Sequence, residues 1–125
     1  MPDLPDPIAA YLRAYNAKDV PAMLACLAED VVFRNVSGGV VDAEARGRED
    51  FARMAAFGAE AFASRAQTVR QAITVWDTTL ATIAYEAVVA RDLPNGWTAG
   101  QALAFEGASL YRLRDGLIVE LIDQS

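Results

Sequence analysis

The chain has 125 residues, 54% of them hydrophobic, and a formal net charge of −6, because 17 acidic residues outnumber 11 basic ones. This length and composition predict one folded domain, residues 1–125, with enough apolar material for a packed core. The sequence contains no histidine, which excludes Ser-His-Asp and Cys-His nucleophile systems, an imidazole base and zinc sites with histidine ligands. Acid–base chemistry therefore has to come from Asp, Glu, Tyr or Arg, and we expect no metal and no cofactor.

The charge and the termini also limit the partners and the compartment. An acidic chain is repelled by phosphate backbones and anionic lipids, so we expect no nucleic-acid and no membrane partner. Residues 1–7 have neither the basic nor the apolar region of a signal peptide, and no apolar run is long enough to span a membrane. Cys26 is the single cysteine and lies in an apolar run, typical of a buried side chain in a reducing compartment. We therefore expect a cytoplasmic protein.

The first part of the chain predicts a helical hairpin. Over residues 7–17 the apolar residues recur at helical spacing and place Tyr11 and Tyr15 on the inward face. Asp19 is typical of the N-cap of a second, short helix over residues 20–27.

The middle of the chain predicts one short strand, a loop and a third helix. The β-branched and aromatic residues 31–33 favour a strand that ends at Asn35. Three glycines, at positions 38, 39 and 47, indicate a loop whose most polar part is residues 42–46. The alanine-rich segment 49–63 has helical apolar spacing.

The last part of the chain is rich in β-forming residues, and turn signals divide it into successive strands. The predicted strands cover residues 67–76, 79–91, 97–113 and 117–123. Helices first and strands last favour an α+β fold, in which the helices pack on one face of a curved, mainly antiparallel sheet.

The predicted strand over residues 79–91 has no plainly polar face. One parity holds Ala81, Ile83 and Tyr85, and the other holds Leu80 and Val88. A sheet with helices on one side only should be polar on the other, so this pattern favours a homodimer through the sheet face. The alternative is that small side chains lie at the surface of an alanine-rich protein.

Three motifs resemble a known family. Tyr-Asn-Ala-Lys-Asp (Tyr15–Asp19), Leu-Ala-Glu-Asp-Val-Val-Phe (Leu27–Phe33) and Gly-Arg-Glu (Gly47–Glu49) resemble the nuclear transport factor 2-like superfamily and, within it, the SnoaL-like proteins. That group includes polyketide cyclases and is related to ketosteroid isomerases and limonene epoxide hydrolases. The resemblance implies a cone-shaped fold whose sheet and helices enclose an apolar cavity. It is specific for the fold and weak for function.

The resemblance carries some residue roles over and leaves others unmatched. Tyr11 matches the oxyanion-binding tyrosine of ketosteroid isomerases, but Asn35 stands where they carry the catalytic Asp, and Ser109 where they carry a protonated Asp. That mechanism is therefore disfavoured. Against limonene epoxide hydrolases, Asn35 resembles the water-positioning Asn and Asp123 the Asp of the last strand.

At other catalytic positions of the related enzymes, this chain has different residues. Glu86 and Val88 stand where the epoxide hydrolases have Arg and a second Asp, so their Asp-Arg-Asp arrangement is missing. Asp123 also stands where SnoaL-like cyclases place a catalytic acid, but those enzymes use a histidine that this chain lacks.

Asp123 is the main candidate for catalysis. It continues the alternation of Leu117, Val119 and Leu121, so its carboxyl should point to the apolar side of the sheet. A carboxyl facing a dry cavity has a raised pKa and is suited to proton transfer near neutrality. The alternative is that the strand ends by Ile122 and leaves Asp123 in solvent.

Glu86 interrupts an otherwise apolar strand, and a buried ionised carboxylate needs a partner. If the family resemblance holds, Glu86 and Asp123 line one cavity and share a proton. The alternatives are a structural ion pair, for example with Arg91, or exposure on the outer face.

The remaining candidates assist or line the cavity. Tyr11 is a possible donor to a carbonyl or enolate oxygen, and Asn35 a possible water-orienting amide, although a tyrosine hydroxyl is often tied to the backbone and Asn at a strand end often makes a turn. The expected ligand-binding residues are Tyr15, Phe33, Phe51, Met54, Val88, Trp97, Phe105, Ser109 and Tyr111.

These residues favour cofactor-independent isomerisation, cyclisation or hydration of an apolar, oxygen-bearing small molecule. The alternative is a non-catalytic domain that binds a hydrophobic ligand or associates through its sheet.

Overall fold

The computed structural model describes residues 2–125, which form three helices and six strands. The helices are α1 (Asp6–Asn16), α2 (Val20–Ala25) and α3 (Arg48–Ala61). The strands are β1 (Leu27–Ser37), β2 (Val40–Arg46), β3 (Phe62–Val75), β4 (Thr78–Val89), β5 (Ala102–Arg114) and β6 (Leu117–Gln124).

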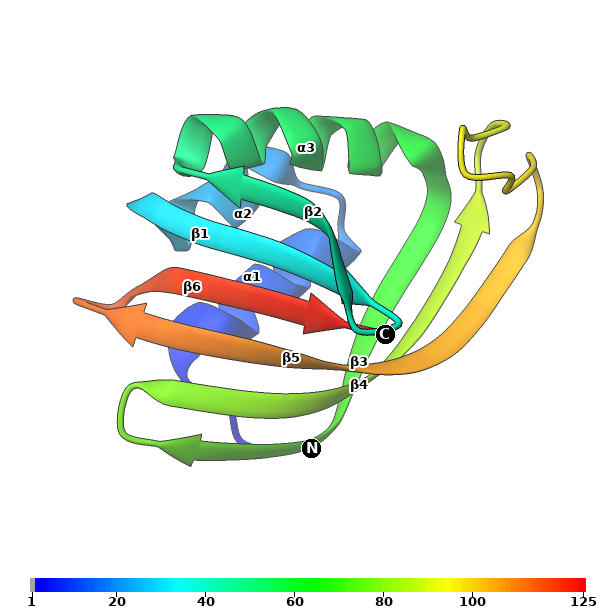
Figure 1. The fold of residues 1–125 in the computed structure, drawn as a ribbon. Coiled ribbons are helices and arrows are strands. Elements are labelled where there is room, and N and C mark those ends of the chain that lie inside the picture. The colour runs from blue at the N-terminus through cyan, green and yellow to red at the C-terminus, as the bar shows by residue number, and fades with distance from the viewer. Residues whose placement is uncertain (1) are drawn as a thin grey trace.

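All the strands belong to one sheet in the order β2-β1-β6-β5-β4-β3. Every neighbouring pair is antiparallel except β1 and β6, which run parallel. Figure 1 shows the sheet curving around the helices, which lie behind and above it, so that the opposite face carries no helix. The predicted α+β architecture is confirmed.

The helical hairpin forms as its sequence pattern predicts. In α1, Ile8, Tyr11 and Leu12 are buried against the sheet. The Asp19 side chain accepts a hydrogen bond from the Ala22 amide at 3.1 Å, which caps the first turn of α2. Lys18 between the two helices takes a positive φ of 56°, which turns the chain back on itself.

The prediction of a loop after the first strand is wrong, because the chain forms a β-hairpin there. β1 continues past Asn35 to Ser37, and β2 returns from Val40, with Ser37 opposite Val40. Gly38 and Gly39 make the turn with φ of 56° and 81°. Two successive positive φ values characterise the tight turn that suits strand twist, and glycine adopts them without steric cost.

Two further boundaries differ from the sequence prediction. β3 begins at Phe62, where the alanine-rich pattern favours more helix, and it is therefore five residues longer at its start. β5 begins only at Ala102, so Trp97 lies in the loop over residues 90–101 rather than in a strand. Gly96 and Gly100 in that loop have positive φ, which an extended strand does not allow.

The hydrophobic core fills the space between the hairpin of α1 and α2 and one end of the sheet. Its fully buried members come from helices and strands alike and include Ile8, Met23, Leu27, Tyr111, Ile118 and Leu121. The long strands β3, β4 and β5 extend beyond this packed end, where the sheet bends away in Figure 1. The fold is thus a cone that is solid at one end.

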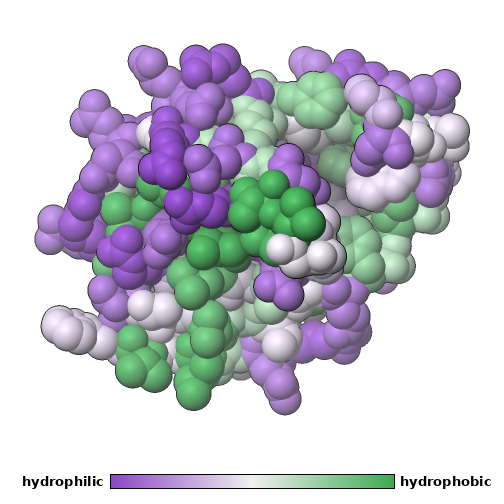
Figure 2. Space-filling view, in the orientation of Figure 1, coloured by the Kyte–Doolittle hydropathy of each residue, from purple (hydrophilic) through white to green (hydrophobic). Residues whose placement is uncertain are grey.

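The helix-free face of the sheet exposes apolar side chains. Leu80 on β4 is 51% exposed and Ile73 on β3 is 62% exposed. Figure 2, in the same orientation as Figure 1, shows hydrophobic surface at the centre, over the end of the β1–β2 hairpin, and at the lower left, over β3 and β4. Within residues 2–125, no helix is long and apolar enough to cross a membrane.

Candidate active-site cavity

The open end of the cone holds a cavity of about 900 Å³. Residues from the three helices and all six strands line it, together with the loop over residues 90–101. The predicted residues that reach the cavity are Tyr11, Tyr15, Phe33, Asn35, Phe51, Met54, Trp97, Phe105, Ser109 and Asp123.

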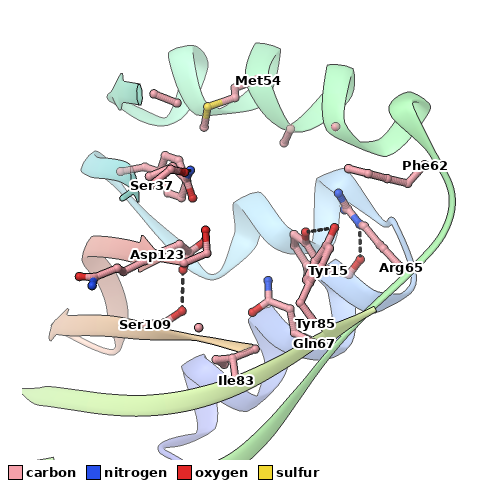
Figure 3. A pocket seen from close by; sticks show the side chains of 18 of the residues that line it. Tyr15, Ser37, Met54, Phe62, Arg65, Gln67, Ile83, Tyr85, Ser109 and Asp123 are labelled. Atoms are coloured by element: carbon pink, nitrogen blue, oxygen red, sulfur yellow. Dashed lines mark hydrogen bonds between the residues drawn. The ribbon is translucent and has the colours of Figure 1, made fainter. Parts of the chain in front are cut away.

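Asp123 lies on the cavity wall and is held by Ser109. The two residues face each other across β5 and β6, and Ser109 Oγ donates a hydrogen bond to Asp123 Oδ1 at 2.6 Å (Figure 3). β6 continues to Gln124, so the alternation from the fully buried Leu121 reaches Asp123 and turns its carboxyl inward. The predicted alternation from Leu117 is interrupted, because a register shift in β6 makes Ile118 and not Leu117 the buried residue at its start. The alternative, a solvated tail after Ile122, is wrong.

Burial changes the acidity of this carboxyl. It raises the pKa of Asp123 from 3.8 to about 6, and the Ser109 hydroxyl opposes this effect because it donates to the ionised form. A group with a pKa near 6 can both accept and release protons close to neutral pH.

Asn35 lies beside Asp123, but its side-chain amide already donates hydrogen bonds to other residues. The two residues are neighbours across the parallel pair of β1 and β6. The Asn35 side-chain amide donates to Asp42 Oδ1 at 2.8 Å and to Ser37 Oγ at 3.3 Å. Hydrogen bonds from the Asn35 amide and the Ser37 hydroxyl lower the pKa of the Asp42 carboxyl. Because β1 continues to Ser37, Asn35 reaches the cavity wall from within a strand and not from a turn.

The Tyr11 hydroxyl faces the cavity without a hydrogen-bond partner among residues 2–125. The residue is 3% exposed, lines the cavity and makes no side-chain hydrogen bond with residues 2–125. Burial and the nearby Asp123 carboxylate raise the pKa of Tyr11 well above 10, so the hydroxyl stays protonated and can donate.

A second polar cluster, formed by Arg65, Tyr15 and Tyr85, lies across the cavity from Asp123 (Figure 3). Tyr15 Oη donates to Tyr85 Oη at 3.3 Å, and the Arg65 guanidinium lies 3.8 Å over the Tyr15 ring. Figure 3 shows Arg65, Tyr15 and Tyr85 on one side of the cavity and Asp123 with Ser109 on the other, with Gln67 between them.

The rest of the wall is apolar and largely aromatic. Phe33 and Phe51 meet edge to face at 5.5 Å between ring centroids, and Tyr85 and Phe105 stack at 4.9 Å. Trp97 reaches the cavity from the loop and contacts Phe62. Such walls bind flat, apolar molecules, with a few polar groups to orient them.

Three predicted site residues lie elsewhere. Glu86 and Val88 point to the exposed, helix-free face, because the inward positions of β4 are Ile83, Tyr85 and Ala87. The expectation that Glu86 shares the cavity with Asp123 is therefore wrong. Tyr111 is fully buried in the core below the cavity and does not line it.

Sequence reasoning missed Arg65, Gln67 and Tyr85. Arg65 lies between the predicted third helix (residues 49–63) and the predicted strand (residues 67–76), and Gln67 is the first residue of that strand, whereas β3 begins at Phe62. Extending the alternation of β3 backward from Gln67 would have placed Arg65 on the same inward face. Tyr85 shares the inward parity of Ile83 and is a polar-tipped aromatic among apolar residues.

No metal site is formed by the part of the chain that the structure describes, since no three His, Cys, Asp or Glu side chains come together there. The cavity therefore offers one carboxyl with a raised pKa, several hydroxyl donors and one buried cation.

The fold matches known structures over almost the whole chain. A hypothetical protein with a ketosteroid isomerase-like fold from Catenulispora acidiphila, in complex with trimethylamine, is 20% identical, with a TM-score of 0.78 over 97% of this chain and 85% of that one. IdmH from Streptomyces antibioticus, described as a candidate polyketide cyclase, is 22% identical, with a TM-score of 0.76 over 94% and 88%.

A further structure is a candidate polyketide cyclase from Xanthomonas campestris. It is 26% identical, with a TM-score of 0.74 over 95% of this chain and 87% of that one. A search of curated proteins found no match.

The family comparison agrees with the fold. The model of the SnoaL-like domain matches residues 8–121, which include both helices of the hairpin and nearly the whole sheet. The resemblance of the three sequence motifs is thereby confirmed, and the chain belongs to the SnoaL-like family.

Proposed function

We propose that this protein is a cofactor-independent enzyme that performs acid–base chemistry on an apolar, oxygen-bearing small molecule in the cavity. The observation that supports this most is the Asp123 carboxyl on the cavity wall, whose pKa is raised to about 6. Membership of a family with polyketide cyclase-like structures agrees with a small-molecule substrate.

The proposed chemistry is a proton transfer at a carbon next to a carbonyl. Ionised Asp123 takes the proton, and the electron pair moves toward the carbonyl oxygen to form an enolate. The Tyr11 hydroxyl donates to that oxygen as its charge develops, in a largely apolar wall. Protonated Asp123 then returns the proton at the same or another carbon.

The outward position of Glu86 limits the reactions that the cavity can catalyse. Glu86 lies on the other face of β4 and cannot act as a separate acid beside Asp123. Asp42 also lines the cavity, but the hydrogen bonds from Asn35 and Ser37 lower its pKa, so it is held as a carboxylate and not as an acid. One group that first accepts and then returns a proton suits isomerisation or an intramolecular cyclisation, which need no net proton transfer.

The test measures solvent-deuterium exchange by NMR in a panel of cyclic ketones and β-diketones. The unmodified protein should accelerate exchange at the acidic carbon, and Asp123→Asn should lower the rate by about 100-fold or more. Asp77→Asn removes one surface carboxylate and serves as the control. A loss of only a few-fold in Asp123→Asn would remove Asp123 from the reaction.

The second candidate function is a non-catalytic domain that binds a hydrophobic ligand. It is favoured by the same outward position of Glu86, which leaves Asp123 as the one cavity-lining carboxyl among residues 2–125 whose pKa is raised. Tight binding of the panel compounds without any accelerated exchange by the unmodified protein would support it.

A further inference from the structure

We propose that Arg65 binds a carboxylate or ionised enol of a flat, conjugated ligand, and so fixes which end of the ligand faces Asp123. This inference rests on the proposed function only in using the same cavity. It concerns a group that the chemistry at Asp123 does not use.

Arg65 is a buried cation without a carboxylate partner among residues 2–125. It is 7% exposed and lines the cavity, whereas Arg70 on the same strand is 59% exposed and pairs with Glu106 at 3.0 Å. Removing a guanidinium from water is costly unless an anion or several acceptors replace the water.

Only some of the hydrogen-bond donors of the Arg65 guanidinium have a partner within residues 2–125. Nε donates to the Tyr15 carbonyl at 3.1 Å, and Nη2 approaches Met23 Sδ at 3.8 Å, while the Tyr15 ring covers one face. Nη1 makes no hydrogen bond with residues 2–125. A guanidinium with unoccupied donors favours planar oxygen anions, which it binds through two parallel hydrogen bonds.

Space beside Nη1 is left open by a glycine of α3. Gly58 lines the cavity, and a Cβ at this position would lie 3.4 Å from Arg65 Nη1. Any larger side chain would fill the approach to the guanidinium.

The surroundings of Arg65 suit a conjugated ring that carries the anion. Phe62, Tyr85 and Phe105 form an aromatic wall at this end of the cavity, with Tyr85 stacked on Phe105. The Tyr85 hydroxyl, which accepts from Tyr15, keeps its own proton to donate.

The two charged groups lie at opposite ends of the cavity. Ser109, the partner of Asp123, pairs with Ala81 of β4, whereas Arg65 pairs with Ala87. Six residues of strand separate these positions, roughly 20 Å along the curved backbone. Asp123 and Asp42 repel an anion at their end, so an anionic group is held at Arg65 and the apolar remainder points toward Asp123.

The experiment compares 2-naphthoate with its neutral counterpart 2-naphthamide, measured by calorimetry with the full chain. We expect the unmodified protein to bind naphthoate about tenfold more tightly than naphthamide, because a charge-assisted pair replaces a neutral one. Arg65→Gln should remove that preference, and Arg65→Lys should keep part of it. Arg53→Gln, which removes an exposed arginine of α3, should leave both affinities unchanged.

Equal binding of the two probes by the unmodified protein would overturn the proposal without any variant, so a folding defect in Arg65→Gln cannot hide the result. A naphthoate preference that survives in Arg65→Gln would also overturn it. Because the readout is binding and not exchange, this test succeeds or fails independently of the deuterium-exchange test of the proposed function.

Discussion

Ser109 Oγ lies 2.6 Å from Asp123 Oδ1, across the antiparallel pair of β5 and β6, and donates a hydrogen bond to it inside the cavity. This contact is the only side-chain hydrogen bond of Asp123 within residues 2–125. It stabilises the ionised carboxylate against the burial that favours the neutral acid.

Replacing Ser109 should therefore make Asp123 a weaker acid. In Ser109→Ala the pKa of Asp123 should rise above about 6, because burial remains and the donor is lost. The pH at which deuterium exchange reaches half its maximum should move upward by the same amount. Ser64→Ala, at an exposed position of β3, is the control, and an unchanged profile in Ser109→Ala would contradict the role given to this hydroxyl.

Asp123 should reduce the stability of the folded chain at neutral pH. Its pKa is raised from 3.8 to about 6 on folding, so the folded state holds the proton more tightly and stability falls as the pH rises through this window. Asp123→Asn should be more stable than the unmodified protein above pH 6 by about 2 kcal/mol, after allowing for partial exposure.

Urea unfolding at a series of pH values measures this difference. It should shrink toward zero below about pH 4, where both states of the unmodified protein are protonated. Asp3→Asn, at an exposed position, controls for the loss of one charge. A stability difference that does not change with pH would contradict the raised pKa.

Tyr11 should matter for the rate and little for substrate binding. Its hydroxyl faces the cavity and makes no side-chain hydrogen bond with residues 2–125. Tyr11→Phe should lower kcat by about 100-fold with a small change in KM, since the donor acts on charge that develops in the transition state.

Tyr111→Phe is the matched control for Tyr11→Phe. The Tyr111 hydroxyl is buried without a hydrogen-bond partner in the described chain, so its removal should leave the rate unchanged and stabilise the fold by about 1 kcal/mol. Equal rate losses in the two variants would point to packing instead of catalysis.

The exposed apolar face of the sheet leads us to propose a homodimer through that face. Leu80, Ile73 and Val88 are exposed there, and a stable interface covers about 800 Å² on each partner. Light scattering at micromolar concentration should give twice the mass of 13.5 kDa. Leu80→Glu should give a monomer, whereas Thr98→Glu in the loop should not. A monomeric unmodified chain would contradict the proposal.

The sequence predicted the elements whose patterns are strong and local. The inward face of α1 with Tyr11 and Tyr15 follows from helical periodicity, and the cap at Asp19 from its residue type. The inward direction of Asp123 follows from its alternation with Leu121, although a register shift earlier in β6 breaks the longer alternation predicted from Leu117. The strand β2 was missed because its polar side chains lie at a sheet edge, where one face is wet and hydrophobic alternation is weak.

The errors at the site have a different physical origin. Glu86 was placed in the cavity through a family correspondence, although its own strand alternates so that Tyr85 points inward. Arg65 was not found because an Ala-rich run blurs the point where α3 ends and β3 begins. Pairing of distant strands brings Arg65, Tyr85 and Asp123 to one cavity, and that pairing cannot be derived from local periodicity.

The protonation of Asp123 can be measured directly by NMR, with the aspartate carboxyl carbons labelled with carbon-13. The Asp123 resonance is assigned by its loss in Asp123→Asn and followed as the pH is raised from about 3 to 9, a range that brackets both the ordinary and the raised pKa. We expect a midpoint at about 6. A midpoint close to the ordinary value of 3.8 would show a solvated carboxylate and would contradict a proton-transfer role for this cavity.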